Sequence, residues 1–152
     1  NQGGMTMNKK RMAKMMQLAN QALTDSGILQ QDKDGPFIED SYNGQTSAFG
    51  ITVLMSGLIP ALAIYYQEAS DTRKINRRNI LEAIGKMIEN DKEVSIEIED
   101  QPLNQKVKGA DTLLRTAFTC ANDKKILKQL STEVLECATA LKQVIRTYKL
   151  KK

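Results

Sequence analysis

Apolar residues recur at helical spacing along most of this chain, and their stripes predict its helices. The first stripe predicts a helix over residues 8–23. It consists of Met12, Met16, Ala19 and Leu23. Turn-forming residues follow it, and we expect the polar, acidic segment 30–40, with its Gly35-Pro36 breaker, to be a loop.

Residues 41–67 contain no Asp, Glu, Lys or Arg, whereas the rest of the chain is densely charged. Such a run is typical of a membrane span, of a buried helical pair, or of a surface that packs on other proteins. The part 48–66 has the length of a span, since a bilayer core is about 30 Å thick. Gly, Ser, Thr and Pro interrupt it, so we expect helices of a soluble protein.

Pro60 lies inside this run and fits the first turn of a helix, because it has no N–H to donate. The run therefore predicts one long helix or two in series. The second would begin near Gly57 or Leu58, with Ser56 as its N-cap. Apolar and small residues keep helical spacing in both halves of the run, which supports two helices. In the first half these residues are Ala48, Ile51, Thr52 and Met55, and in the second half they are Leu58, Leu62, Tyr65 and Ala69.

Three further segments complete the predicted elements. Residues 80–88 form a helical stripe, and residues 94–98 alternate like a strand, which we interpret as an extended connection because no pairing partner is evident. Pro102 opens the next helix, and a final helix reaches Tyr148 with a potential break at Ser131-Thr132. The prediction is an all-α protein: a compact bundle of five to seven helices in one domain over residues 1–152. We expect residues 1–4 to be a cloning remnant and residues 148–152 to fray.

Histidine is absent from the chain. This excludes Ser-His-Asp and Cys-His catalysis and His-ligated zinc. Glu133 and Glu136 are the one neat carboxylate pair at helical spacing, and we expect them on a solvated helix face. Cys120 and Cys137 stand alone, and no export signal is visible, which favours reduced thiols and the cytoplasm. We expect no enzyme activity, no metal, no cofactor and no small-molecule substrate.

Charge changes the picture, because a net charge of +4 is unevenly distributed. Acidic residues gather in segments 25–41 and 89–100. Cations form three clusters that could contact a phosphate backbone. The clusters are Lys9, Lys10, Arg11 and Lys14; then Arg73, Lys74, Arg77 and Arg78; and, on one face of the last helix, Lys142, Arg146 and Lys149. Three tyrosines lie in the uncharged run, away from these cations, so any nucleic acid would be held by its backbone without sequence preference.

The stretch FGITVLMSGLIPALAIYYQ, residues 49–67, resembles the signature of the small subunit of the Cmr complex, the type III-B CRISPR RNA-guided effector. The matching step is Ser56-Gly57-Leu58, followed by ALAIY. The basic opening KKRMAKMMQLA and the closing ALKQVIRTYK also resemble that family's first and last helices. With this likeness, the uncharged run is interpreted as fold core, in which Gly57 permits close helix approach.

The resemblance implies a small, non-catalytic, all-α subunit. Its copies would stack as a minor filament along the backbone subunits and help to hold the guide RNA and target RNA. Its partners would be the backbone and large subunits and further copies of itself. By this analogy the cations of the first and last helices face the target strand, whereas Arg73, Lys74, Arg77 and Arg78 have no family motif behind them.

Two alternatives stay open beside this interpretation. One is a helical adaptor that binds only protein, and it differs in showing no salt-sensitive RNA binding. The other is a single-span membrane protein built on residues 48–66.

Overall fold

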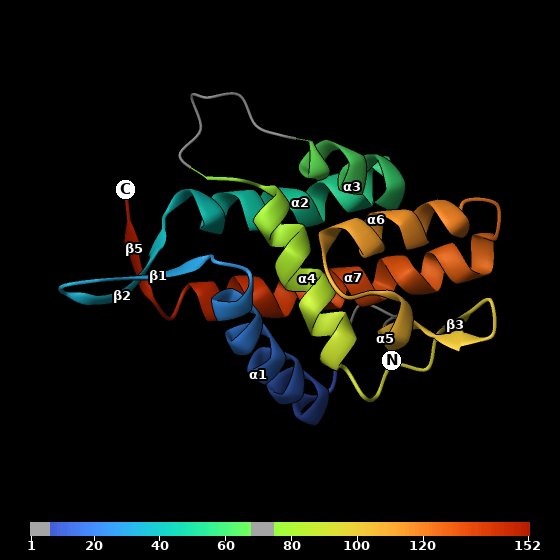
Figure 1. The fold of residues 1–152 in the computed structure, drawn as a ribbon, viewed down its shortest axis with the longest axis horizontal. Helices are drawn as coiled ribbons and strands as arrows, with labels where there is room; N and C mark the ends of the chain where they lie inside the picture. The colour runs from blue at the N-terminus through green and yellow to red at the C-terminus, as the bar shows by residue number, and fades with distance from the viewer. Residues whose placement is uncertain (1–6, 68–74) are drawn as a thin grey trace.

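The computed structural model describes residues 7–67 and 75–152 and folds them mainly into helices (Figure 1). Within these residues there are seven helices: α1 Lys9–Asp25, α2 Ser41–Ser56, α3 Leu58–Tyr66, α4 Arg78–Asn90, α5 Leu103–Lys106, α6 Ala110–Thr119 and α7 Lys124–Ile145. Five short strands accompany them: β1 Leu29–Asp32, β2 Gly35–Glu39, β3 Glu97–Ile98, β4 Gln101–Pro102 and β5 Lys149–Lys151. The prediction of a mostly α-helical bundle is confirmed.

Helix α7 is the axis of the bundle and packs against α1, α2 and α4 (Figure 1). It begins after Asp123, whose carboxylate accepts the N–H of Ile126 at 3.1 Å and so caps the helix. The predicted break at Ser131-Thr132 is wrong. Both hydroxyls donate to carbonyls one turn earlier, at 2.8 and 3.1 Å, so these residues satisfy their polar groups inside a continuous helix.

The uncharged run forms two helices in series that meet at Gly57. Gly57 has φ +93°, which favours glycine, and its N–H caps α2 by donating to the carbonyl of Val53 at 2.9 Å. Helix α3 begins at Leu58 with Pro60 in its first turn, as predicted. Ser56 ends α2 and does not cap α3. A Cβ on Gly57 would meet only Pro60 Cδ at 3.8 Å, so the glycine provides backbone conformation and not the close helix approach that we expected.

Helix α2 buries a different face from the one marked by Ile51 and Met55. Its buried side chains are Tyr42, Thr46, Phe49 and Val53, and Phe49 packs edge-on against Tyr65 of α3. Ile51, Leu54 and Met55 are 61%, 65% and 81% exposed. The run is therefore only partly fold core. No helix within residues 7–67 and 75–152 has the length and apolar character that crossing a membrane requires.

The prediction of a loop over residues 30–40 is wrong, because this segment forms most of the hairpin β1–β2. Its two-residue turn is held by the N–H of Asp34 donating to Asp32 at 2.8 Å, and Phe37 and Ile38 bury their side chains. The C-terminal residues, expected to fray, contain β5, which pairs in parallel with β2. This pairing supplies the third strand that makes the short hairpin stable.

Segment 94–98 ends in a second small hairpin, because β3 pairs with β4. Only two residues pair on each strand, so most of segment 94–98 stays extended without a strand partner. After Pro102 the chain forms the single turn α5 and then a separate helix, α6, in place of the one helix predicted. Helices α4 and α6 approach closely, because a Cβ on Gly85 would lie 2.4 Å from the Cα of Gly109.

Candidate functional site

Lysines of α1 point outward, but Arg11 points into the protein. Lys9 and Lys10 are exposed and Lys14 is partly exposed. Helix α1 begins after Asn8, whose side chain accepts the N–H of Arg11 at 2.7 Å. The turn that follows places the guanidinium of Arg11 between α7 and the end of α4, where its side chain is only 17% exposed.

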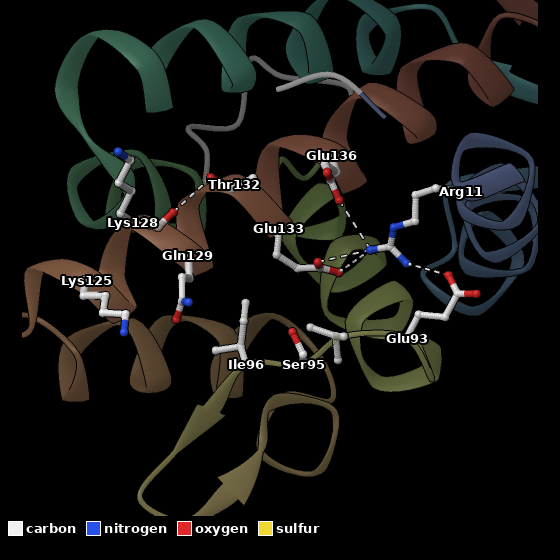
Figure 2. A pocket seen from close by; sticks show the side chains of 11 residues that line it. Arg11, Glu93, Ser95, Ile96, Lys125, Lys128, Gln129, Thr132, Glu133 and Glu136 are labelled. Carbon is white, nitrogen blue, oxygen red and sulfur yellow. Dashed lines mark hydrogen bonds and ion pairs between the residues drawn. The ribbon is translucent and has the colours of Figure 1, made fainter. Parts of the chain in front are cut away.

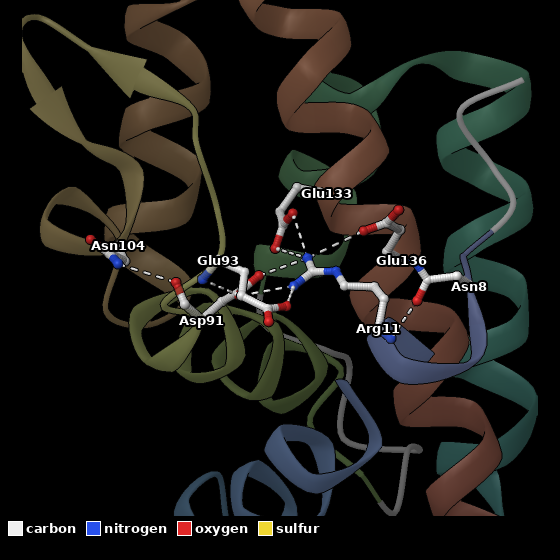
Figure 3. A network of polar contacts seen from close by, with 7 residues as sticks. All are labelled: Asn8, Arg11, Asp91, Glu93, Asn104, Glu133 and Glu136. Atoms are coloured by element: carbon white, nitrogen blue, oxygen red, sulfur yellow. Dashed lines mark hydrogen bonds and ion pairs between the residues drawn. The ribbon is translucent and has the colours of Figure 1, made fainter. Parts of the chain in front are cut away.

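Four carboxylates surround this guanidinium (Figure 3). Asp91 accepts two hydrogen bonds from Arg11, from Nη1 at 2.9 Å and from Nη2 at 2.8 Å. Nη2 also contacts Glu133 at 3.2 Å and Glu136 at 3.3 Å, and Nη1 contacts Glu93 at 3.3 Å. We call these five residues the Arg11 cluster. It joins the first turn of α1, the segment after α4 and the middle of α7.

Burial within the cluster separates the pKa values of its two innermost carboxyls. The side chain of Glu133 is 7% exposed; its burial, together with a hydrogen bond to Asp91, raises its pKa from 4.5 to about 8. Burial alone would also raise the pKa of Asp91, but the charge and hydrogen bonds of Arg11, together with hydrogen bonds from Glu133 and from the main-chain N–H of Glu93, outweigh it and hold that pKa below its usual value. The same pairing raises the pKa of Arg11. At neutral pH, Glu133 is therefore protonated and Asp91 ionised. The prediction of a solvated face for Glu133 is wrong.

Two carboxyls with separated pKa values are also the pattern of an acid–base catalyst. Here, however, the side chain of Asp91 is 0% exposed, and Arg11 occupies both of its oxygens. Its main-chain carbonyl accepts a hydrogen bond from Asn104 at 3.1 Å. Among the described residues no group of three or more His, Cys, Asp or Glu side chains is placed to hold a metal ion. The geometry of the cluster is that of a buried structural contact between helices.

Both cysteines are free and buried. Burial raises the pKa of both thiols, that of Cys137 strongly. Each is therefore a protonated, apolar side chain at neutral pH rather than a nucleophile.

Arg77 and Arg78 lie against the tyrosines at the end of α3. The guanidinium of Arg77 is 4.5 Å from the ring centroid of Tyr65, and that of Arg78 is 4.2 Å from Tyr66. Arg77 donates to the carbonyl of Ile64 at 3.3 Å, and Arg78 to that of Tyr66 at 2.7 Å. These arginines satisfy carbonyls at the C-terminal end of α3, where cations are favourable.

The prediction that the cations lie away from the aromatic residues is therefore wrong for Arg77 and Arg78. Arg77 and Arg78, at the start of α4, lie on the tyrosine rings of α3. Arg73 and Lys74, the other members of that cluster, lie outside the described residues.

The last basic group does not share one helix face, because α7 ends at Ile145. Lys142 is partly exposed on α7, and Arg146 directly follows the helix and donates to Asn43 at 3.0 Å. Lys149 is exposed in β5. The structure leaves Lys9, Lys10, Lys14, Lys142 and Lys149 without an ion pair to any described residue, whereas Arg11 is taken into the fold.

Sequence reasoning missed two features of the structure. The Arg11 cluster joins residues 80 and 122 positions apart, and only the Glu133 and Glu136 spacing marked one part of it. The other is an outward-facing apolar surface on α2, formed by Ile51, Leu54 and Met55, which we call the α2 patch. Large exposed apolar groups that lie together on one helix mark contact surfaces for other molecules.

Fold and surface together define a small helical bundle whose distinctive features face outward: an uncharged apolar helix face, and lysines that form no ion pair with the residues the structure describes. The model of one protein family, described as CRISPR-associated protein (Cas_Cmr5), matches residues 7–148. The chain belongs to this family, a family of Cmr complex subunits. No curated protein and no solved structure matches the chain.

Proposed function

We propose that the chain is a non-catalytic scaffold subunit of a CRISPR RNA-guided, RNA-targeting effector complex in the cytoplasm. The observation that carries this proposal is the family match over residues 7–148. Copies of the chain stack as a minor filament beside the backbone and large subunits. Together with them, the copies hold the guide RNA and target RNA.

Contact with RNA is assigned to the lysines that have no ion pair within the described chain. These lysines are Lys9, Lys10 and Lys14 of α1, Lys142 of α7 and Lys149 of β5. Arg146, directly after α7, completes the group. Each is free to neutralise a phosphate, so binding is independent of sequence and depends steeply on salt. Arg11 is left out of this group because its guanidinium is ion-paired with buried carboxylates. Arg77 and Arg78 are left out because their guanidinium groups lie on tyrosine rings and donate to main-chain carbonyls. Arg146 stays in the group because it is exposed and its contact to Asn43 uses one N–H.

Contact between copies is assigned to the α2 patch. Ile51, Leu54 and Met55 expose apolar surface that carries no charge, and water would leave this surface when a second copy covers it. The same patch favours the competing function, a helical adaptor that binds only protein. RNA binding separates the two functions.

Fluorescence anisotropy with two unrelated single-stranded RNAs tests the proposal. If about six phosphates are neutralised, the logarithm of the binding constant falls with the logarithm of salt concentration with a slope of roughly −4. We expect similar affinities for both RNAs and a shallower slope for the variant Lys10→Glu/Lys14→Glu. The matched control is Lys108→Glu, which changes an exposed lysine outside the proposed group.

The same test can be made on the assembled complex. If the complex no longer binds RNA when these lysines are replaced by Glu, the RNA contact is supported in its natural setting. Salt-independent binding, or equal loss in the Lys108→Glu control, would contradict it and favour the adaptor. Purification of the tagged chain from its host, with identification of the recovered proteins and RNA, tests the complex membership separately.

A further inference from the structure

A cavity of about 480 Å³ lies between α7 and the extended segment 94–96 (Figure 2). Side chains of α7 form one wall, and Val94, Ser95 and Ile96 form the other. Arg11 and Glu93 lie at one end, and Lys125 and Gln129 at the opposite end (Figure 2). We call this cavity the α7 groove. It is separate from the α2 patch.

The extended wall carries free main-chain groups. Ile96 accepts a hydrogen bond from the N–H of Leu103 at 2.8 Å, and pairing with β4 begins only at Glu97. No main-chain hydrogen bond joins Val94 or Ser95 to another described residue. An extended segment with free N–H and C=O groups is the element to which a second extended chain adds by main-chain pairing.

Charge along the groove is polarised. Lys125 makes no ion pair with any described residue, so its end of the groove is cationic. At the other end, Glu93 and Glu136 share the single cation of the Arg11 cluster with ionised Asp91 and with protonated Glu133, which leaves an excess of negative charge. Apolar surface from Val94 and Ile96 separates the two ends.

We propose that the α7 groove binds an extended segment of a partner protein. The segment pairs with the main chain at Val94 and Ser95 and packs an apolar side chain between the ends of the groove. It places an acidic side chain beside Lys125 and a basic one beside Glu93 and Glu136. A nucleic acid fits this groove poorly, because the acidic hairpin residues Glu97, Glu99 and Asp100 are exposed beside it. The inference goes beyond the proposed RNA contact and is independent of it.

Panning a phage-displayed library of random dodecapeptides on the full chain tests this inference. We expect the selected sequences to share an acidic and a basic residue that flank an apolar centre. Synthetic peptides from the selection are then measured by fluorescence anisotropy against three variants. Ser95→Trp fills the groove from an exposed position, Lys125→Glu reverses its cationic end, and Lys124→Glu is the control one residue away, outside the groove lining.

Ser95→Trp should weaken binding by at least about tenfold, because the groove is then blocked. Lys125→Glu should weaken it by about fivefold and Lys124→Glu should leave it unchanged. A peptide whose acidic residue is replaced by Lys should regain affinity for Lys125→Glu. The inference is overturned if no peptide is enriched, or if enriched peptides bind Ser95→Trp and Lys125→Glu as tightly as the original chain. Circular dichroism of each variant checks that the fold is retained.

Discussion

Replacing Glu133 by Gln should stabilise the protein at neutral pH and leave its stability unchanged in acid. Glu133 has a pKa of about 8 in the folded state against 4.5 when unperturbed. Between these values the folded protein holds a proton that the unfolded chain has released. Its stability therefore falls as pH rises, by about 1.4 kcal/mol for each pH unit. Above pH 8 both states are ionised and the contribution is constant.

Gln is neutral at every pH and can replace the carboxyl proton with an amide N–H toward Asp91. Over the full range from pH 4.5 to about 8, the raised pKa of Glu133 would lower the free energy of unfolding by roughly 5 kcal/mol. The more exposed Glu93 and Glu136 can move away from ionised Glu133, which reduces this loss in the original chain. We therefore expect Glu133→Gln to raise the free energy of unfolding by about 2 kcal/mol at pH 8. Below pH 4.5 the gain should approach zero, because wild-type Glu133 is then protonated in both states.

Urea unfolding followed by far-ultraviolet circular dichroism at pH 5, 6, 7 and 8 measures this difference. Other titrating groups cancel when Glu133→Gln is compared with the original chain at each pH. Glu97→Gln, at an exposed position in the β3–β4 hairpin, is the control and should show a constant difference. The reasoning is refuted if the difference between Glu133→Gln and the original chain is the same at pH 5 and pH 8.

Three further changes test other parts of the structure. Arg11→Met should destabilise the protein by about 3 kcal/mol at pH 7 in urea unfolding, since it leaves a buried carboxylate without its cation; a loss below about 1 kcal/mol would contradict this. Gly85→Ala should cost about 3 kcal/mol, because its Cβ would lie 2.4 Å from Gly109, whereas Gly44→Ala, with nothing within 4 Å, should stabilise α2 slightly. Met55→Asp should reduce self-association in sedimentation equilibrium without lowering thermal stability, since this side chain is 81% exposed; unchanged association would exclude the α2 patch as the contact between copies.

Elements with strong local patterns could be predicted from the sequence. Helix α4 follows its apolar stripe closely, and the start of α3 follows from Pro60. Helix α1 lies where its stripe predicts it, but it buries Met15 and Ala22, whereas Met12 and Met16 of the predicted stripe are only partly buried. The hairpin β1–β2 could not be predicted, because its third strand comes from residues 149–151 at the far end of the chain. Polar strands of this length carry little local signal, and it is the distant pairing that fixes their conformation.

The buried face of α2 could not be predicted for another reason. A run without charges has no polar side to mark which residues face water, so the core-facing stripe through Phe49 and the exposed stripe through Met55 look alike in the sequence. Basic residues posed a similar problem. Charge alone does not separate Lys10, which faces solvent, from Arg11, which neutralises buried carboxylates.

The Arg11 cluster has a kinetic consequence as well. Its contacts join residues 80, 122 and 125 positions apart, so each of them closes a long loop whose entropy must be lost before the contact forms. Such contacts form late in folding, after local helices and their nearest partners have docked. Changes in the cluster should therefore act mainly on the rate of unfolding and leave the rate of folding nearly unchanged. In that sense Arg11 determines how long the assembled bundle lasts, more than how quickly it is made.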